Sequence, residues 1–308
     1  MFSRCSYPHQ NGVIASVGAA RGGPPAQGNM SPAVAAAVGR TRLGGGTPLL
    51  LLPGLCCTGR LWQRQIQALA AAGGGGAASS SSSESEVFVG DPHWSGCLKR
   101  TAAALLELLP DGPVSVVGHS LGGYLAMELV RQAPEGRIAR LGLVSTQARA
   151  DTPAISARRR ALIAAVHADG PLAGVSAPSI LLGSSGRAQC GGSTDDRGLW
   201  GLVEEMATEV GGDGFERGCM AAMGRPDSRP TLRSLPATLP TLLLVGNDDA
   251  VTPLAATREM AKLLGGGGRD GGGRTGLQVE VVKGCGHMAR EWITLCLFCR
   301  SLACIYII

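Results

Sequence analysis

Short apolar runs recur along this chain and alternate with segments of helical character. The predicted strands are the apolar runs at 47–55, 86–90, 114–118, 138–145, 241–246 and 277–283. The predicted helices between them cover 60–71, 98–109, 121–132 and 252–264. Runs that are apolar at nearly every position are typical of parallel strands buried on both faces. Strands that alternate with helices in this way predict an α/β fold, with a mostly parallel central sheet flanked by helices.

The alternation stops between the fourth and fifth of these strands. Residues 147–236 contain helix signals but no convincing strand, beginning with D-T-P at 151–153, a helix cap followed by proline at the first helical position. We expect an inserted helical lid over the carboxyl edge of the sheet. The Gly/Ser-rich stretches at 73–84 and 183–193 are predicted to be surface loops.

The first 46 residues differ in composition from the rest. They are rich in Ala, Gly, Ser and Pro and contain four arginines but no acidic residue. This composition predicts a disordered leader or an organelle transit peptide, or an extension that precedes a true start at Met30. A compact apolar core, as in a secretory signal, is missing. We therefore expect a chloroplast, mitochondrial or cytoplasmic protein that is not secreted, with its folded domain at 47–308.

Charge and cysteine content exclude several classes of function. The net charge is +5, and the four leader arginines leave about +1 for the remainder, which argues against a nucleic-acid partner. The ten cysteines are irregularly spaced, so disulfides are not expected. The pair Cys296 and Cys299 has no histidine or second cysteine pair at the sequence spacing of a metal site, so a metal is not expected either. The apolar stretch at 292–308 contains Arg300 and is too short for a good membrane span.

The candidate nucleophile is Ser120, in the sequence G-H-S-L-G at 118–122. This G-x-S-x-G pattern lies between a predicted strand and a predicted helix, the context in which a sharp turn exposes the serine. The glycines are needed because side chains there would collide with neighbouring elements. A glycine-rich turn without function is the alternative reading of the motif alone.

Two further residue types complete a catalytic set. Asp248 and Asp249 follow the strand at 241–246, and His287 follows the last predicted strand in G-C-G-H. A serine needs an imidazole to take its proton, and the imidazole needs a carboxylate to orient it. The chain order Ser, Asp, His fits that role. The backbone N–H groups of Leu55 and Leu121 are the expected oxyanion donors, although the loop around Leu55 could be a plain strand-to-helix turn.

These motifs resemble those of the α/β-hydrolase superfamily over about residues 48–287. The resemblance rests on 118–123, on 246–253, which is similar to G-x-x-D-x-x-T-P, and on 284–288, G-C-G-H-M. The G-x-x-D spacing selects Asp249 over its neighbour. The resemblance implies hydrolysis of a small carboxylic ester, thioester or related acyl compound, without a cofactor. A serine at the motif disfavours the dehalogenase and epoxide hydrolase branches, which have an aspartate there.

Other features received different interpretations. His93 is read as a loop residue near the cleft because nothing places it with an acid, and His167 as a structural histidine of the lid. Cys56 and Cys57 are read as small fillers. After His287 the superfamily has an amphipathic helix, whereas 292–308 is nearly uniformly apolar.

Two alternative functions remain open from the sequence. One is a hydrolase-fold protein that binds a small ligand with little turnover, favoured if His287 is misplaced. The other is different acyl or carbon–carbon bond chemistry with the same three residues. Neither the oligomeric state nor the substrate is predicted.

Overall fold

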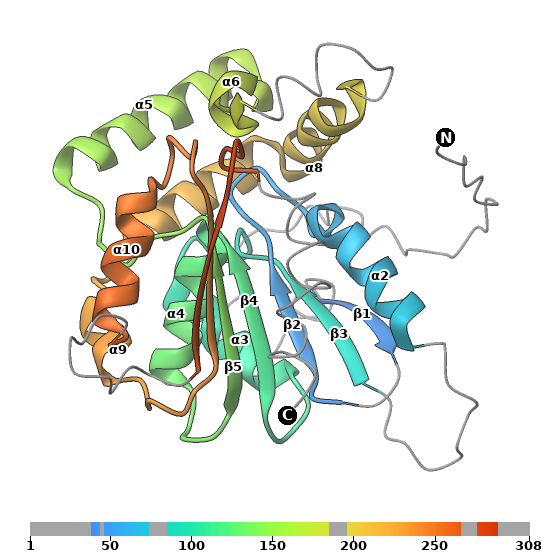
Figure 1. Cartoon of the computed structure of the whole chain (residues 1–308). Coiled ribbons are helices and arrows are strands. Elements are labelled where there is room, and N and C mark those ends of the chain that lie inside the picture. Colours follow the sequence, from blue (N-terminus) through green and yellow to red (C-terminus); the bar gives the residue numbers. More distant parts are fainter. Residues whose placement is uncertain (1–37, 44–45, 74–84, 185–195, 266–275, 289–308) are drawn as a thin grey trace, which may run out of the picture.

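The computed structural model describes residues 38–43, 46–73, 85–184, 196–265 and 276–288. Within these residues, seven strands form one sheet in the order β1-β3-β2-β4-β5-β6-β7 (Figure 1). The strands are β1 (Val38–Leu43), β2 (Leu49–Leu52), β3 (Ser85–Gly90), β4 (Val114–His119), β5 (Ile138–Val144), β6 (Thr241–Gly246) and β7 (Leu277–Val282). Strands β2 to β7 are parallel, which confirms the predicted mostly parallel sheet.

The first strand corrects one prediction. β1 pairs antiparallel with β3, from Val38 opposite Gly90 to Leu43 opposite Ser85. The exclusion of residues 1–46 from the fold is therefore wrong for this stretch. Its arginines suggested a leader, but charged residues are common on strands at the edge of a sheet, where only one side of the backbone is paired. Residues 1–37 lie outside the described residues.

Helices cover both faces of the sheet. These are η1 (Gly59–Trp62), α2 (Gln63–Gly73), α3 (Leu98–Leu108), α4 (Leu121–Gln132) and α10 (Leu254–Leu263). Along β2, Leu50 and Leu52 pack with α3, α4 and α10, whereas Leu49 and Leu51 pack with η1 and α2. Because successive strand residues point to opposite faces, an unbroken leucine run serves two cores.

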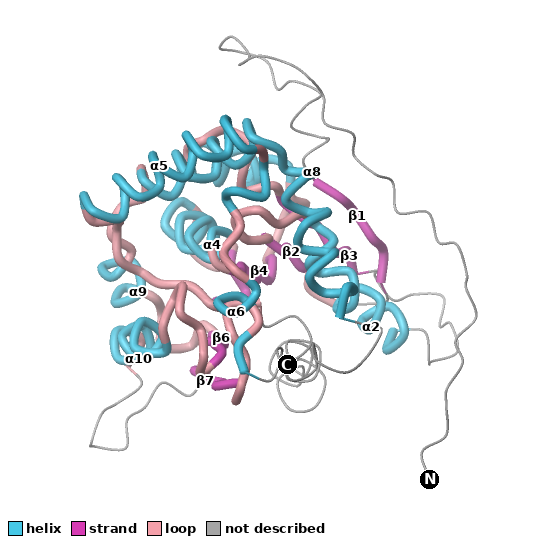
Figure 2. The backbone as a smooth tube through the Cα atoms, turned by 90° about the horizontal axis from the view of Figure 1, so that it is seen from above, coloured by secondary structure: helices cyan, strands magenta, loops and turns pink. Residues whose placement is uncertain are grey.

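The described elements between β5 and β6 are all helical, as expected. They are α5 (Pro153–Asp169), η2 (Pro171–Gly174), α6 (Pro178–Leu181), α8 (Asp196–Met223) and α9 (Arg229–Ser234). The first begins as predicted, with Thr152 Oγ1 accepting a hydrogen bond from the N–H of Ile155. Figures 1 and 2 show α5, α6 and α8 lying across one end of the sheet. α9 instead joins the core beside α4 through Leu232, so the covering part of the insertion ends before the expected residue 236.

Candidate active site

Ser120 lies at a strained turn between β4 and α4. Its backbone angles are φ 51° and ψ −111°, a conformation that costs a non-glycine residue about 1–3 kcal/mol and persists only where the surroundings enforce it. The surroundings here are hydrogen bonds to the neighbouring strand. The Ser120 N–H donates to the carbonyl of Val144 at 2.9 Å, and the Thr146 hydroxyl donates to the carbonyl of Ser120 at 2.8 Å.

Glycines make this turn sterically feasible. A Cβ at Gly118 would lie 2.2 Å from the Gly122 carbonyl oxygen, and a Cβ at Gly122 would lie 2.1 Å from the carbonyl oxygen of Leu52. Both contacts are with backbone, which cannot move aside. The start of α4 therefore packs directly on β4 and on the end of β2.

His287 connects Ser120 to a carboxylate. Its Nε2 lies 2.9 Å from Ser120 Oγ, and its Nδ1 lies 2.9 Å from Oδ2 and 3.1 Å from Oδ1 of Asp249. A carboxylate only accepts hydrogen bonds, so we assign the proton to Nδ1. Nε2 then has a lone pair that can accept the serine proton. The histidine and the aspartate are both buried.

Asp249 is held by the backbone as well as by His287. Oδ1 accepts from the N–H groups of Val251 and Thr252 at 2.9 and 2.8 Å, and Oδ2 accepts from the Thr252 hydroxyl at 2.9 Å. Burial alone would raise the pKa of Asp249, but the hydrogen bond and charge of His287 and the bonds from Thr252 outweigh it, so the pKa is lowered. The group is thus held as a carboxylate.

The neighbouring aspartate has a different partner. Oδ2 of Asp248 accepts a hydrogen bond from the N–H of Ser184 at 2.9 Å, at the end of the described residues that follow α6. It therefore ties the helical insertion to the loop after β6. Of the two aspartates considered from the sequence, Asp249 is the one that reaches His287.

Comparison with known proteins identifies the family of the fold. The pattern that describes the alpha/beta hydrolase family matches residues 49–292. The chain belongs to this family.

Individual relatives of this alpha/beta hydrolase share between 16% and 32% of its residues in the matched regions. A protein of Azorhizobium caulinodans whose name describes a carbamate hydrolase, RutD, is 32% identical over 142 residues, which are 45% of this chain and 52% of that protein. The chain thus matches about half the length of that relative. An enol-lactonase from Burkholderia xenovorans LB400 has a similar structure, with a TM-score of 0.65 and 16% identity over 87% of this chain and 96% of the other. An esterase from Thermogutta terrifontis has a TM-score of 0.60 and 22% identity over 84% and 91%.

His119, the residue before Ser120 in this hydrolase, supports the loop that carries His287. Its Nε2–H donates to the carbonyl of His287 at 3.0 Å, and the two rings are 5.1 Å apart. Burial, and then the charge of His287, lower the pKa of His119 to about 3, so it is neutral near pH 7. This role was not predicted from the sequence, where the only signal is the place of His119 within the motif.

The two predicted oxyanion donors lie beside Ser120. Leu121 is the first residue of α4, so its N–H has no acceptor within the helix. Leu55 follows Gly54, whose Cβ would lie 3.2 Å from the Cβ of Ser120. The turn after β2 therefore passes close to the serine.

The reading of His93 needs correction. Its Nδ1 and its backbone N–H both contact Oδ1 of Asp91, at 2.9 and 2.8 Å, so an acid does accompany it. The D-x-H spacing after a strand was the signal available in the sequence. His167 lies in an exposed pair with Glu216 that joins α5 to α8, as a structural histidine would.

The thiols next to Leu55 are not activated. Burial raises the pKa of Cys56, and raises that of Cys57 to about 12 despite a hydrogen bond to Gly54. Both behave as small fillers. Among the residues that the structure describes, no group of three His, Cys, Asp or Glu side chains could hold a metal ion. The pair Cys296 and Cys299 lies outside that part of the chain.

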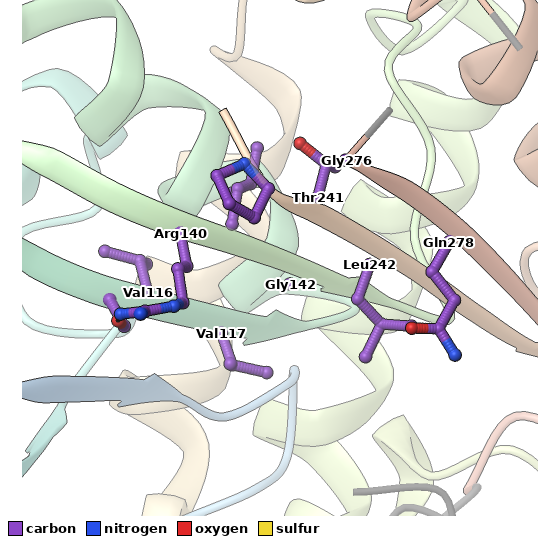
Figure 3. A pocket seen from close by; sticks show the side chains of 11 residues that line it. Val116, Val117, Arg140, Gly142, Thr241, Leu242, Gly276 and Gln278 are labelled. Carbon is purple, nitrogen blue, oxygen red and sulfur yellow. The ribbon is translucent and has the colours of Figure 1, made fainter. Parts of the chain in front are cut away.

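A hollow on the sheet lies apart from these residues. Figure 3 shows it over neighbouring positions of four adjacent strands, Val117, Gly142, Leu242 and Gln278. It forms where Gly142 provides no side chain, and Ser120, Asp249 and His287 do not line it. In the described part of the chain, no helix is long and apolar enough to cross a membrane.

Proposed function

We propose that this alpha/beta hydrolase is a serine hydrolase that cleaves a small carboxylic ester, thioester or related acyl compound through an acyl-enzyme. The observation that carries the proposal is the unbroken series of contacts from Ser120 Oγ to His287 and from His287 to Asp249, each 2.9 Å long at its shortest. Such a series activates an alcohol that is otherwise a poor nucleophile.

The reaction proceeds in two steps. Ser120 Oγ attacks the acyl carbon while His287 Nε2 takes its proton, and His287 returns that proton to the leaving group. A water molecule then attacks the acyl-enzyme with His287 again as the base, which frees the acid and regenerates Ser120. Asp249 orients the imidazole and stabilises its positive charge. The N–H groups of Leu55 and Leu121 stabilise the negative oxygen, at about 3 kcal/mol for each donor.

The helical insertion acts as a lid in this proposal. Its residues contact the loop that carries His287, since the N–H groups of Gly286 and Met288 donate to the carbonyls of Leu182 and Leu181 at 3.2 and 2.8 Å. A lid excludes water and shapes the pocket that selects the substrate. The name of the RutD relative is compatible with this class, because a carbamate is also attacked at a carbonyl carbon.

A ligand-binding protein with little turnover is the competing reading. A misplaced His287 would favour this competing function. The 2.9 Å contact between His287 Nε2 and Ser120 Oγ supports turnover instead.

Labelling with a fluorophosphonate probe tests the proposal, because the probe reacts with activated serines. We expect the full chain to label at Ser120, as located by mass spectrometry, and S120A and H287A to lose labelling. S145A is the control, since Ser145 also has a positive φ but is fully buried, and it should label like the wild type. A folded wild-type chain that does not label would contradict the proposal.

A further inference from the structure

His93 is a buried histidine whose orientation is fixed from one side. It follows β3 and is 3% exposed. The Asp91 carboxylate accepts a hydrogen bond from Nδ1 of His93 at 2.9 Å. The backbone carbonyl of His93 accepts a hydrogen bond from Arg217 Nε of α8 at 2.7 Å. Because the carboxylate is an acceptor, the proton of the neutral ring lies on Nδ1. Nε2 therefore has a lone pair and can only accept a hydrogen bond.

That lone pair is not used within the described residues. Nε2 of His93 is buried and has no hydrogen-bond partner among them. Leaving such a group unsatisfied costs about 1–3 kcal/mol, so buried polar atoms nearly always have a partner. The missing partner can be supplied by a bound molecule.

One edge of the ring packs with the side chains of Leu55 and Leu121. Cδ2, the ring atom bonded to Nε2, lies where α8 has Gly218. A Cβ at Gly218 would be 2.7 Å from His93 Cδ2, 2.6 Å from Leu55 Cδ1 and 3.3 Å from Leu121 Cδ2. His93 thus shares a small space with the side chains of the two residues proposed as oxyanion donors. The glycine makes this close packing possible, because a Cβ there would be too close to all three side chains.

The side of the site on which His93 lies indicates which part of the substrate it meets. In the proposed reaction the leaving group takes its proton from His287 and must lie towards that residue. His93 lies instead with Leu55 and Leu121. On this side of the site, a substrate bound at Ser120 has its acyl part, which remains attached to the serine.

We propose that His93 determines specificity, by accepting a hydrogen bond from a hydroxyl or N–H group on the acyl part of the substrate. The inference rests on the proposed hydrolase function and narrows its substrate class to acyl groups that carry such a donor. His93 takes no part in bond making or breaking. A site built to pair with a polar group discriminates strongly against an analogue that lacks it, because its own buried atom is then left unpaired.

Esters with one leaving group and different acyl chains test this. The set is 4-nitrophenyl butanoate with its 2-hydroxy and 3-hydroxy derivatives, each rate being divided by that of uncatalysed hydrolysis. We expect the wild type to prefer at least one hydroxy ester by about tenfold or more in kcat/KM. H93L should remove the preference, so that the ratio of kcat/KM for the hydroxy ester to kcat/KM for the butanoate falls to about one. H93Q, which keeps a polar group near the position of Nε2, should retain part of it.

Controls separate recognition from a structural role. A structural role would lower kcat/KM equally for all three esters and lower the urea midpoint. H167L is the matched variant, because His167 also pairs with an acid but lies in an exposed position outside this space, and it should keep the preference. G218A, which fills the space beside His93, should weaken it.

The outcomes distinguish this inference from the function on which it rests. A wild type that labels at Ser120 and hydrolyses the three esters without preference overturns the inference and leaves the proposed function standing. Equal preference in wild type and H93L overturns it too, as does labelling without hydrolysis of any ester in the set. A chain that neither labels nor hydrolyses overturns the proposed function, and the inference with it.

Discussion

Thr252 contributes both its backbone N–H and its hydroxyl to Asp249, one to each carboxylate oxygen. The carboxylate is therefore held in place independently of His287. This fits a group whose task is to orient an imidazole rather than to exchange a proton. The D-x-x-T spacing of residues 249–252 produces this arrangement locally, since the turn after β6 brings the N–H groups of Val251 and Thr252 to the same oxygen.

T252V isolates the hydroxyl from the backbone donors. It removes one hydrogen bond to a charged acceptor, worth about 1.5 kcal/mol, while both N–H donors remain. We expect roughly a tenfold loss in kcat/KM on a 4-nitrophenyl ester, against a loss of about 10⁴ for D249N. T257V is the control, because the Thr257 hydroxyl is buried without a partner among the described residues. If T252V were as inactive as D249N, the N–H groups of Val251 and Thr252 would not be sufficient to hold the Asp249 carboxylate in place.

A buried ion cluster joins the helical insertion to α4, the helix that begins beside Ser120. The Asp151 side chain is fully buried, 2.7 Å from Arg159 Nε and 2.6 Å from Arg225 Nη1. The Arg225 guanidinium also stacks over the ring of Tyr124, 3.9 Å from its centre, and donates to the carbonyl of Arg149 at 2.9 Å. Residues from α5, α4 and the segment after α8 thus meet at one point.

R225M tests how strongly this cluster anchors the insertion. Removing one partner leaves a buried charge incompletely compensated, which typically destabilises a protein by about 3–5 kcal/mol. Arg159 remains, so we expect a loss at the lower end, about 3 kcal/mol, in urea unfolding. R149M is the matched control, since the Arg149 side chain is 57% exposed where it pairs with Glu259, and such pairs contribute under about 1 kcal/mol. Equal effects of the two variants would show that the buried cluster is not an anchor.

Across the whole molecule, the sequence identified features that depend on pattern and order. The apolar runs predicted the parallel sheet, and the positions of Ser120, Asp249 and His287 after three strands predicted that they would meet at one edge. The choice between Asp248 and Asp249 rested on resemblance alone. Its physical reason, the bond from Ser184 to Asp248, joins positions 64 residues apart and cannot be read from local sequence.

Contacts between distant segments account for what was missed. β1 was mistaken for part of a leader because its composition matched one, and its pairing with β3 is a contact between distant segments. For His93, the acid at Asp91 was visible two residues away, but the packing of the histidine ring against Gly218 of α8 joins distant parts of the chain. The 292–308 segment, which departs from the superfamily pattern, lies outside the described residues.

The stability of the whole chain should depend on pH through His119. Its pKa is about 3 in the folded protein, against about 6.5 in an unfolded chain. Between these values the unfolded chain holds a proton that the folded protein does not. Acid therefore favours unfolding, by up to about 1.4 kcal/mol for each pH unit below 6.5. Asp249 acts in a lower window, because its pKa is depressed and its contribution is lost only as the pH falls below about 4.

Urea unfolding between pH 7 and 4 measures this dependence. H119Q replaces the titrating ring with an amide that can still donate to the His287 carbonyl, so the free energy of unfolding should fall less steeply than in the wild type as the pH drops. T257V changes no titratable group, and its curve should run parallel to the wild type. Parallel curves for wild type and H119Q would mean that His119 takes up its proton in the folded protein as readily as in the unfolded chain. The neutral, buried donor that supports the His287 loop would then be the wrong description of this residue.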